Sequence, residues 1–449
     1  MIPKQSRGTA TLAALATAAA LVLSLMSAAT AANAAPTPDD SRQVYGWGSN
    51  EYGSLGDGTD VAQHSPVSIG GLSDVVKIVP FGFGDYAIRA DGTVWAWGNN
   101  YSGQIGDGTT KDRHAPVRIK GLTKVVDVVV ARGHTYALRS DGTIWAWGLK
   151  GETDGRARPK DLYGPKKLSG VCATKSLTTN FYSTYAVCRS GSVYAWGLNT
   201  DGQLGDGTTK DRKTPRKIAG LTKVKKVYAQ GWSVFAIRSG GSVMSWGAGD
   251  DGGLGIGKAG IRTRPKSVTA LKNVISITGG FGTYLGVRSN GTVLSWGGKS
   301  KPKRIAGLTG ITKVKMSDDT NYALRKDGTV WVWGGADSNR YGQLGKGTRD
   351  RKSHRTPSKV PGLTKVKDVQ AGFYYAMALR TDGTLWSWGS DANPLNGKST
   401  GDGALGVCGK TQLSKPARIP GVRDVTRFVT GGWTTHVVGR STGKTCATG

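Results

Sequence analysis

Short stretches of alternating hydrophobic and polar residues recur along this chain at a nearly constant interval. Eight of them end in Trp-Gly, at Trp47, Trp97, Trp147, Trp196, Trp246, Trp296, Trp333 and Trp388. Successive tryptophans are separated by 50, 50, 49, 50, 50, 37 and 55 residues. Periods of this length are typical of solenoids, propellers and other repeat arrays. The hydrophobic pattern therefore predicts a repeat protein.

One repeat, residues 116–148, contains four short segments with the composition of β-strands. Residues 116–119 and 124–130 are the first two, and the second is rich in valine. Residues 136–139 and 144–148 are the third and fourth, joined by a turn with Asp141-Gly142, a pair that tolerates positive φ. Four short strands separated by turn signals predict an all-β fold, a single β-propeller of four-stranded blades, with one repeat in each blade.

The two ends of the repeat array predict how the ring closes. Residues 44–48 form a Trp-Gly strand with no strand before it, and the last copy stops after the strand at residues 436–438, without a Trp-Gly strand. We expect the N-terminal strand to complete the C-terminal blade, since closure removes exposed sheet edges. This composite blade brings the count to eight, the number we favour, with seven blades as the alternative.

The first residues resemble an export signal. Lys4 and Arg7 precede an uncharged apolar run, residues 11–27, and Ala32-Asn33-Ala34 offers a small-residue cleavage site. This pattern predicts a secretory signal peptide over residues 1–34, a short linker over 35–43 and the propeller over 44–446. We therefore expect a secreted protein that does not span a membrane.

The four cysteines suit an exported protein, because disulfides persist outside the cytosol. Cys172 and Cys188 fall in neighbouring strand segments, so a bond between them would join adjacent strands. Cys408 lies in the last long loop and Cys446 near the C-terminus, where a bond would fasten the end of the chain. Four cysteines allow three pairings, and the sequence leaves the choice open.

The strongly basic composition favours anionic partners. The chain has 61 Lys and Arg against 30 Asp and Glu, a formal net charge of +31. For an exported protein we expect anionic wall polymers, acidic proteins or membrane surfaces rather than nucleic acid, although solubility alone could explain the excess. No nucleophile elbow or His-Glu-x-x-His occurs. We expect no enzymatic activity, catalytic residue, metal or cofactor; Asp57, Asp107 and Asp206 are interpreted as turn residues.

Loops on one face of the ring contain the candidate binding residues. Because strand direction alternates, the loops between second and third strands share a face with the loops that leave the fourth strand; these are long and variable, and we call this side the long-loop face. We select one candidate binding residue from each loop between the second and third strands: Phe83, His134, Tyr182, Trp232, Phe281, Asp319, Phe373 and Trp433. Aromatic side chains dominate binding energy at interfaces. These residues could instead cap their own blades, but their variety favours binding.

The repeat resembles that of the regulator of chromosome condensation family. The resemblance rests on Tyr-Ala-Leu-Arg-Ser-Asp-Gly-Thr-Ile-Trp-Ala-Trp-Gly at 136–148 and Asp-Gly-Gln-Leu-Gly-Asp-Gly-Thr at 201–208, and extends from about residue 44 to 445. It implies a propeller that is usually seven-bladed, so eight blades would be a departure. It also implies functions as different as nuclear nucleotide exchange and secreted β-lactamase inhibition; the inhibitor is the nearest functional analogue.

Two functions remain open from the sequence. The first is a secreted, non-enzymatic, inhibitor-like propeller that recognises an extracellular protein through the long-loop face. The second is a lectin-like module that binds anionic or neutral cell-surface glycan. Repeated sugar pockets would use nearly identical residues, and the varied loop residues therefore favour protein.

Overall fold

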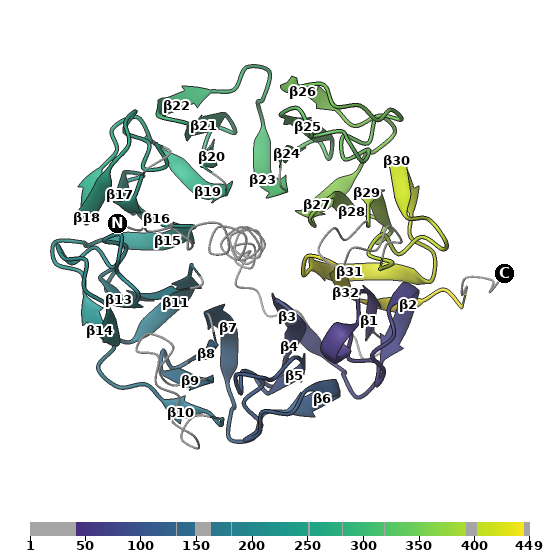
Figure 1. Ribbon diagram of the computed structural model, residues 1–449, viewed down its shortest axis with the longest axis horizontal. Coiled ribbons are helices and arrows are strands. Elements are labelled where there is room, and N and C mark those ends of the chain that lie inside the picture. The colour runs from purple at the N-terminus through teal and green to yellow at the C-terminus, as the bar shows by residue number, and fades with distance from the viewer. Residues whose placement is uncertain are drawn as a thin grey trace, which may run out of the picture.

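The computed structural model describes residues 42–131, 133–148, 163–180, 182–249, 252–280, 282–317, 319–391 and 402–443. These residues form eight four-stranded antiparallel sheets arranged as the blades of one ring (Figure 1). The all-β propeller predicted from the sequence is confirmed, and eight blades replace the alternative of seven. The expected signal peptide and nearly all of the linker lie outside the described residues.

Seven blades are continuous in sequence. Blades 1 to 4 consist of β3 (Val75–Phe81), β4 (Gly84–Arg89), β5 (Val94–Gly98), β6 (Arg113–Arg118), β7 (Val125–Ala131), β8 (His134–Arg139), β9 (Ile144–Gly148), β10 (Lys166–Lys167), β11 (Thr174–Thr179), β12 (Ser183–Cys188), β13 (Val193–Gly197), β14 (Arg212–Lys217), β15 (Val224–Gln230), β16 (Ser233–Arg238), β17 (Val243–Ala248) and β18 (Ile261–Ser267). Blades 5 to 7 consist of β19 (Val274–Gly280), β20 (Thr283–Arg288), β21 (Val293–Gly297), β22 (Ser300–Arg304), β23 (Ile311–Ser317), β24 (Thr320–Arg325), β25 (Val330–Gly334), β26 (His354–Lys359), β27 (Val366–Ala371), β28 (Tyr375–Arg380), β29 (Leu385–Ser390) and β30 (Gln412–Arg418).

Blade 8 closes the ring with strands from both ends of the propeller. Its order is β2 (Gln63–Ile69), β1 (Gln43–Gly48), β32 (Thr434–Ser441) and β31 (Val422–Thr430). Tyr45 of β1 lies opposite Val437 of β32. The predicted closure is confirmed, but two N-terminal strands take part rather than one. A short 3-10 helix, η1 (Glu51–Gly53), follows β1.

The extra N-terminal strand corrects the predicted blade boundaries. The strand expected at residues 116–119 belongs to blade 1, where Val117 of β6 lies opposite Ala96 of β5, and not to the blade that follows it in sequence. Each sequence repeat therefore begins in one blade and continues in the next. The proline in β6, Pro116, fits this outer position, because an edge strand does not need every backbone N–H for pairing.

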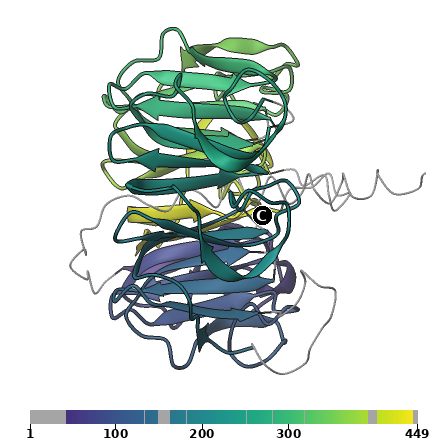
Figure 2. The same ribbon diagram turned by 90° about the vertical axis from the view of Figure 1, so that its left-hand side faces the viewer.

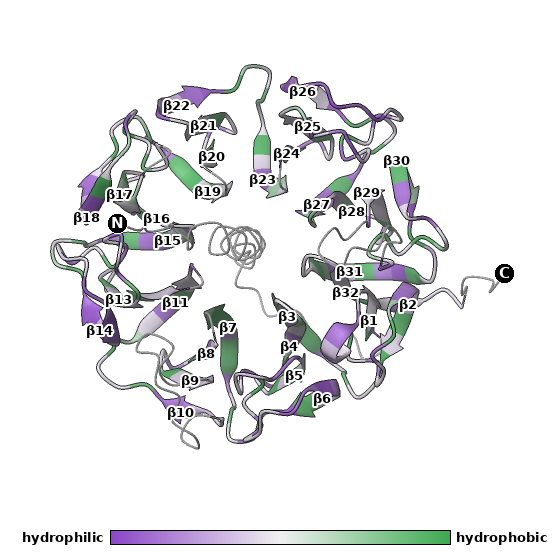
Figure 3. Ribbon diagram, in the orientation of Figure 1, coloured by the Kyte–Doolittle hydropathy of each residue, from purple (hydrophilic) through white to green (hydrophobic). Residues whose placement is uncertain are grey.

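The polarity of the strands follows their distance from the axis. The outermost strands β14, β18 and β22 are largely hydrophilic, whereas the inner strand β7 is hydrophobic (Figure 3). Charged edge strands discourage pairing with other chains. Neighbouring blades share hydrophobic clusters; one joins Tyr185 and Leu204 of blade 3 to Val227 and Trp246 of blade 4. This packing fixes each blade against the next.

The Trp-x-Trp-Gly strands contribute to the core as the sequence indicates, with a difference between the two tryptophans. The second is fully buried, as at Trp97 and Trp388. The first is half-buried, and an arginine covers it: the Arg325 guanidinium lies 4.4 Å from the centroid of Trp331. The alternation of the strand turns the first tryptophan toward the blade surface.

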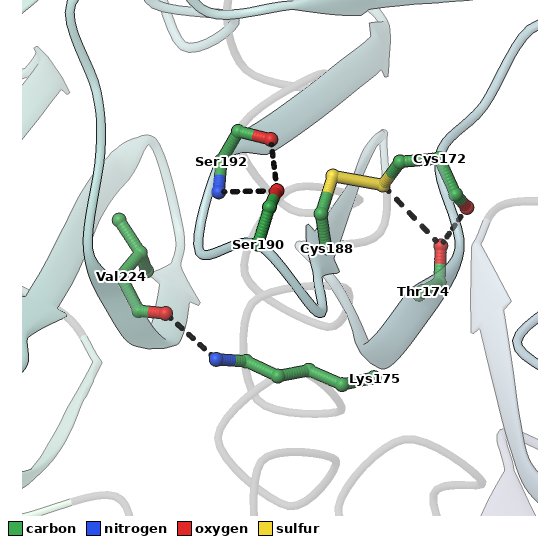
Figure 4. The surroundings of a disulfide bond; sticks show 7 residues. All are labelled: Cys172, Thr174, Lys175, Cys188, Ser190, Ser192 and Val224. Atoms are coloured by element: carbon green, nitrogen blue, oxygen red, sulfur yellow. Dashed lines mark hydrogen bonds between the residues drawn. A yellow bond between two sulfur atoms is a disulfide. The ribbon is translucent and has the colours of Figure 1, made fainter.

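One predicted disulfide is present within blade 3. Cys172, which precedes β11, bonds to Cys188 at the end of β12 and joins the two adjacent strands (Figure 4). Cys408 is also disulfide-bonded. Cys446 lies outside the described residues, so the predicted fastening of the C-terminus stays a prediction.

The loops alternate between the two faces of the ring, which Figure 2 shows from its side. Because all blades are antiparallel, the loops that leave each inner strand lie on the same face as the loops that lead to each outer strand. This is the predicted long-loop face. Within the described ranges, no helix has the length and apolar character needed to cross a membrane.

Candidate functional site

The glycine of each Trp-Gly strand holds a loop residue in place on the long-loop face. A Cβ on Gly48 would lie 2.0 Å from the Trp433 carbonyl oxygen, and one on Gly247 would lie 2.2 Å from that of Trp232. The residue after the glycine donates a backbone hydrogen bond to the same oxygen, as Ala248 does to Trp232 over 3.0 Å. Glycine is needed here because backbone approaches backbone too closely for a side chain.

We call the residue that supplies this carbonyl the platform position. Strand pairing places one residue there in each blade, immediately before the residue opposite the Trp-Gly glycine: Phe83, Gly133, Tyr182, Trp232, Gly282, Asp319, Tyr374 and Trp433. The fixed backbone and the variable side chain make this the natural place for recognition.

Five of the eight residues selected from the sequence occupy the platform position. His134 is one residue later and begins β8, and Phe373 is one residue earlier. Phe281 lies outside the described residues. Tyr374 was missed because Phe373, next to it, is also aromatic. Counting back from the residue that pairs with Gly389 would have identified Tyr374.

Blades 3 and 4 provide the clearest aromatic platform. The rings of Tyr182 and Trp232 stack with centroids 5.1 Å apart and an angle of 7° between their planes. Trp232 keeps 38% of its surface exposed. The two side chains come from neighbouring blades, and Asn180 Nδ2 donates a 2.9 Å hydrogen bond to the Gly231 carbonyl beside Trp232. The stack is therefore an exposed apolar surface on a fixed backbone.

A second aromatic group extends over loops of blades 6, 7, 8 and 1. Its ring pairs, with centroid distances of 5.0, 4.1 and 5.3 Å, are Tyr341–Tyr374, Phe373–Trp433 and Tyr52–Phe83. Phe373 is only 7% exposed, whereas Phe83 is 46% exposed. The glycines at the platform positions of blades 2 and 5 separate this group from the Tyr182–Trp232 stack. The candidate residues thus form two groups rather than one even ring.

Two of the sequence-selected residues have local structural contacts. The Asp319 carboxylate accepts a 3.1 Å hydrogen bond from the backbone N–H of Asp337, in the long loop of its own blade. The His134 ring stacks on Tyr136 with centroids 6.4 Å apart. For these two positions the contacts support the capping interpretation that the sequence left open.

The buried tryptophans also fix the long loops. The indole Nε1 of Trp97 donates to the Ser54 carbonyl over 3.1 Å, and that of Trp246 donates to the Gln203 carbonyl over 2.7 Å. In each case the acceptor belongs to a loop of the preceding blade. Trp196 instead donates to the Tyr136 hydroxyl over 3.0 Å. These hydrogen bonds hold the loops beside the platform in defined positions.

The aspartates of the long loops are turn residues, as predicted. The Asp57 carboxylate accepts hydrogen bonds from the backbone and hydroxyl of Thr59, over 3.0 and 2.8 Å. Asp107 makes an ion pair with Arg113 at 2.5 Å. Partial burial acts to raise the pKa of Asp107, but hydrogen bonds from Thr109 and Arg113 leave it below its ordinary value. Among the described residues, no cluster of three His, Cys, Asp or Glu could hold a metal ion.

Comparison with known proteins agrees with this architecture. The family profile described as RCC1-like domain matches residues 10–303. Two profiles of the regulator of chromosome condensation (RCC1) repeat match residues 327–379 and 366–393. No curated protein matches the chain.

Solved structures of similar shape have low sequence identity. Prp20p from Saccharomyces cerevisiae, studied for its binding to Gsp1p and histones, is 20% identical with a TM-score of 0.60, over 90% of this chain and 92% of that one. Yeast RCC1 (Prp20) bound to Kap60 is 19% identical with a TM-score of 0.61, over 98% and 97%. Human WBSCR16 is 19% identical with a TM-score of 0.58, over 89% and 99%. Identities this low show the fold alone.

Proposed function

Because this chain belongs to the RCC1-like domain family, with a profile match over residues 10–303, we propose that it is a secreted, non-enzymatic binding propeller. It captures an extracellular protein through the long-loop face, in the manner of an inhibitor. The observation that carries this proposal is the exposed Tyr182–Trp232 stack on a backbone fixed by the Trp-Gly glycines.

The geometry of the stack supports a protein partner. Trp and Tyr are enriched among the residues that dominate protein interfaces. The ring of Tyr182 covers one side of Trp232, so the pair offers a rigid apolar surface and little side-chain freedom is lost on binding. The net charge of +31 would favour encounter with an acidic partner. The solved yeast relatives were studied with protein partners, which is consistent with this use of the fold.

The proposed partner class is tested by binding to exported proteins. The immobilised propeller is exposed to proteins from the culture medium of the source organism, and each captured protein is purified and its Kd measured. We expect Trp232→Ala to weaken binding roughly 30-fold, or about 2 kcal/mol. Val126→Ala is the control, since Val126 is 50% exposed at the start of β7, on the opposite face.

A glycan array tested in parallel separates the two functions that the sequence left open. Binding of a purified exported protein that depends on Trp232 supports the proposal. Equal affinities of the wild type and Trp232→Ala for every captured protein would contradict it. Glycan binding that depends on Trp232, without protein capture, would replace it with the lectin-like function, and binding to wall polymers that salt abolishes in all variants would indicate charge attraction alone.

A further inference from the structure

Positive charge is concentrated on one side of the ring. Residues 212–317, from β14 to β23, contain 20 Lys and Arg and only two acidic residues, Asp250 and Asp251, both outside the described residues. Residues 42–131, which form much of the other side, contain 8 Lys and Arg against 9 Asp and Glu (Figure 1). The net charge of +31 is therefore unevenly spread, and one side of the propeller supplies most of it.

Strand pairing shows where this charge reaches the circumference of the ring. In each blade, one residue of the outer strand lies opposite the residue that precedes the tryptophan of Trp-Gly. In four consecutive blades, 2 to 5, this outer residue is a cation: Lys166, Arg216, Lys266 and Lys303. In blades 6, 7, 8 and 1 it is uncharged: Ser358, Ala417, Val67 and Val117. We call the four cations the basic track.

The basic track is exposed and lies on blades that are fixed against one another. All four residues are exposed, and none has a side-chain hydrogen bond or ion pair with another described residue. The Gly207 N–H, in a loop of blade 3, donates to the Thr263 carbonyl of β18 over 2.7 Å. Gly257, in a loop of blade 4, packs against β22, where a Cβ on it would lie 2.5 Å from Lys301 Cγ. These contacts hold successive outer strands side by side.

The hairpin turns of the same blades lack a source of negative charge that other blades have. In blade 6 the turn residue is Asp327; hydrogen bonds within the turn lower its pKa, with added attraction from two cations, one of them Lys359 of the outer strand. Blades 1, 2 and 7 have the same Asp-Gly-Thr turn, whereas blades 3, 4 and 5 have an uncharged turn residue: Ser190, Gly240 and Asn290. Lys217 of β14 and Arg304 of β22 are equivalent to Lys359 and therefore have no turn aspartate beside them.

Protection of the sheet edges does not account for the basic track. Charged residues on edge strands discourage pairing with other chains. The same position is occupied by Val67 in blade 8 and by Val117 in blade 1, so an outer strand of this propeller does not need a cation there. Like charges gathered on one side of a protein raise the local potential and attract anions. The track therefore indicates an anionic partner.

We propose that the basic track binds a linear polyanion with a phosphodiester in every repeat, such as a poly(glycerol phosphate) wall polymer. The four cations recur once per blade, so a chain with regularly spaced charges meets an equivalent cation at each step. Lys and Arg hold phosphate oxygens by charge-assisted hydrogen bonds, and the exposed Lys217 and Arg304 add contacts beside the track.

The two parts of this proposal rest on different grounds. The choice of a wall polymer rests on the proposed export of the protein, whereas the position of the site rests on strand pairing and exposure. The track lies on the outer strands, away from the platform residues of the long-loop face. Polymer binding and protein capture are therefore independent, and each can be lost without the other.

Calorimetric titration of the propeller with purified poly(glycerol phosphate), over a range of NaCl concentrations, tests the proposal. The test variant combines Arg216→Gln, Lys266→Gln and Lys303→Gln. It should bind about 100-fold more weakly than the wild type at about 0.1 M salt, because each phosphate contact on a single strand contributes about 0.7 to the slope of log K against log salt. The slope itself should fall by about 2.

The matched control removes the same number of charges from the other half of the ring. It combines Arg118→Gln, Lys359→Gln and Arg418→Gln, at exposed positions of β6, β26 and β30. Its affinity should change by less than about threefold, because charges more than about 10 Å away are largely screened at about 0.1 M salt. Trp232→Ala should bind the polymer like the wild type, which separates this site from protein capture.

Both triple variants should melt near the wild-type temperature, since all six positions are exposed, and this keeps the comparison independent of folding. The proposal is wrong if the wild type does not bind the polymer or if the test variant binds it as tightly. It is also wrong if the control variant loses as much affinity as the test variant, because net charge alone would then explain the attraction. Duplex DNA is the comparison polyanion: binding of DNA through the track, without binding of poly(glycerol phosphate), would show that the wall polymer is the wrong partner.

Discussion

Two blade junctions use the aromatic residues of the same loops in opposite ways. Between blades 3 and 4, the platform residues Tyr182 and Trp232 stack with their planes 7° apart, and Trp232 stays 38% exposed. Between blades 7 and 8, the platform residue Trp433 instead packs at 4.1 Å on Phe373, which is 7% exposed. An aromatic residue in this loop can therefore present a surface or seal a junction.

The difference follows from how each junction is built. Blades 3 and 4 are continuous in sequence, and Lys175 Nζ of blade 3 donates to the Val224 carbonyl of β15 (Figure 4). Thr178 Oγ1 donates to the Val227 carbonyl of the same strand. Blade 8 is assembled from both ends of the propeller, so its neighbours must hold strands that no loop connects. Burying Phe373 beside Trp433 adds apolar contact at this closing blade. At the junction of blades 3 and 4, by contrast, Trp232 faces solvent.

The largest expected effect separates these two roles. Phe373→Ala should lower the free energy of unfolding by about 3 to 5 kcal/mol, the usual loss for a buried phenylalanine. Trp232→Ala should cost about 1 kcal/mol, because it loses only a stacking contact at the surface. Urea unfolding followed by tryptophan fluorescence and circular dichroism measures both. Equal losses for the two variants would show that exposure does not distinguish the junctions.

Removing the disulfide tests how the stability of blade 3 depends on a covalent bond. In blade 8 the corresponding contribution comes from apolar packing. The Cys172–Cys188 bond closes a loop with a sequence separation of 16. Replacing both cysteines with serine should cost about 3 kcal/mol, because the unfolded chain regains the freedom of that loop. Reducing agent should destabilise the wild type in the same direction and leave this variant nearly unaffected unless the Cys408 disulfide contributes. An unchanged urea midpoint for the double serine variant would contradict this account.

A buried contact between a histidine and an aspartate makes the closing blade sensitive to pH. His436 Nδ1 of β32 lies 3.4 Å from Asp85 Oδ2 of blade 1, and both residues are 1% exposed. Neither oxygen of the Asp85 carboxylate has a hydrogen-bond partner among the described residues. Burial, opposed by attraction to His436, raises the pKa of Asp85 to about 6. The His436 Nε2 atom contacts the Leu55 carbonyl at 3.0 Å.

The sign of the pH effect follows from the raised pKa. The folded protein holds the Asp85 proton more tightly than the unfolded chain, so this stabilisation is complete below about pH 4 and is lost as pH rises through about 6. The loss is about 2 to 3 kcal/mol. Asp85→Asn should remove it, so the stability difference between wild type and variant should change between pH 4 and 7. A constant difference over that range would refute the assignment, and Asp60→Asn, at an exposed position, is the control.

The sequence predicts the blades of the propeller better than it predicts the candidate binding surface. Trp-Gly periodicity identifies all eight blades, because each tryptophan fills the same buried position. The repeat does not show where one blade ends and the next begins. From the sequence, the strand at 116–119 could belong to the blade before it or to the blade after it, and its pairing with Ala96 assigns it to the blade before.

The platform position shows why the site was harder to predict. The loop after the inner strand has the same length in blades 4 and 7, since Val227 pairs with Ala236 and Val369 with Ala378. Phe373 was chosen because it is aromatic and lies next to Tyr374, the residue equivalent to Trp232. Pairing within each blade decides the platform position. Contacts between blades, which join residues about 50 positions apart, are likewise invisible in the repeat.

The smallest effect concerns the support of the exposed stack. Asn180 is 1% exposed, and its side chain accepts a 2.8 Å hydrogen bond from the Ser183 N–H and donates a 2.9 Å hydrogen bond to the Gly231 carbonyl. Asn180→Ala should cost about 1 to 2 kcal/mol, because two buried backbone groups lose their partner. It should also weaken partner binding, but less than Trp232→Ala, since the Trp232 ring remains and only its backbone support is lost. Asn180→Asp keeps the acceptor for Ser183 and loses the donor to Gly231. If the Gly231 contact positions Trp232, this variant should bind the partner as weakly as Asn180→Ala. Wild-type affinity in both variants would show that the stack needs no support from blade 3.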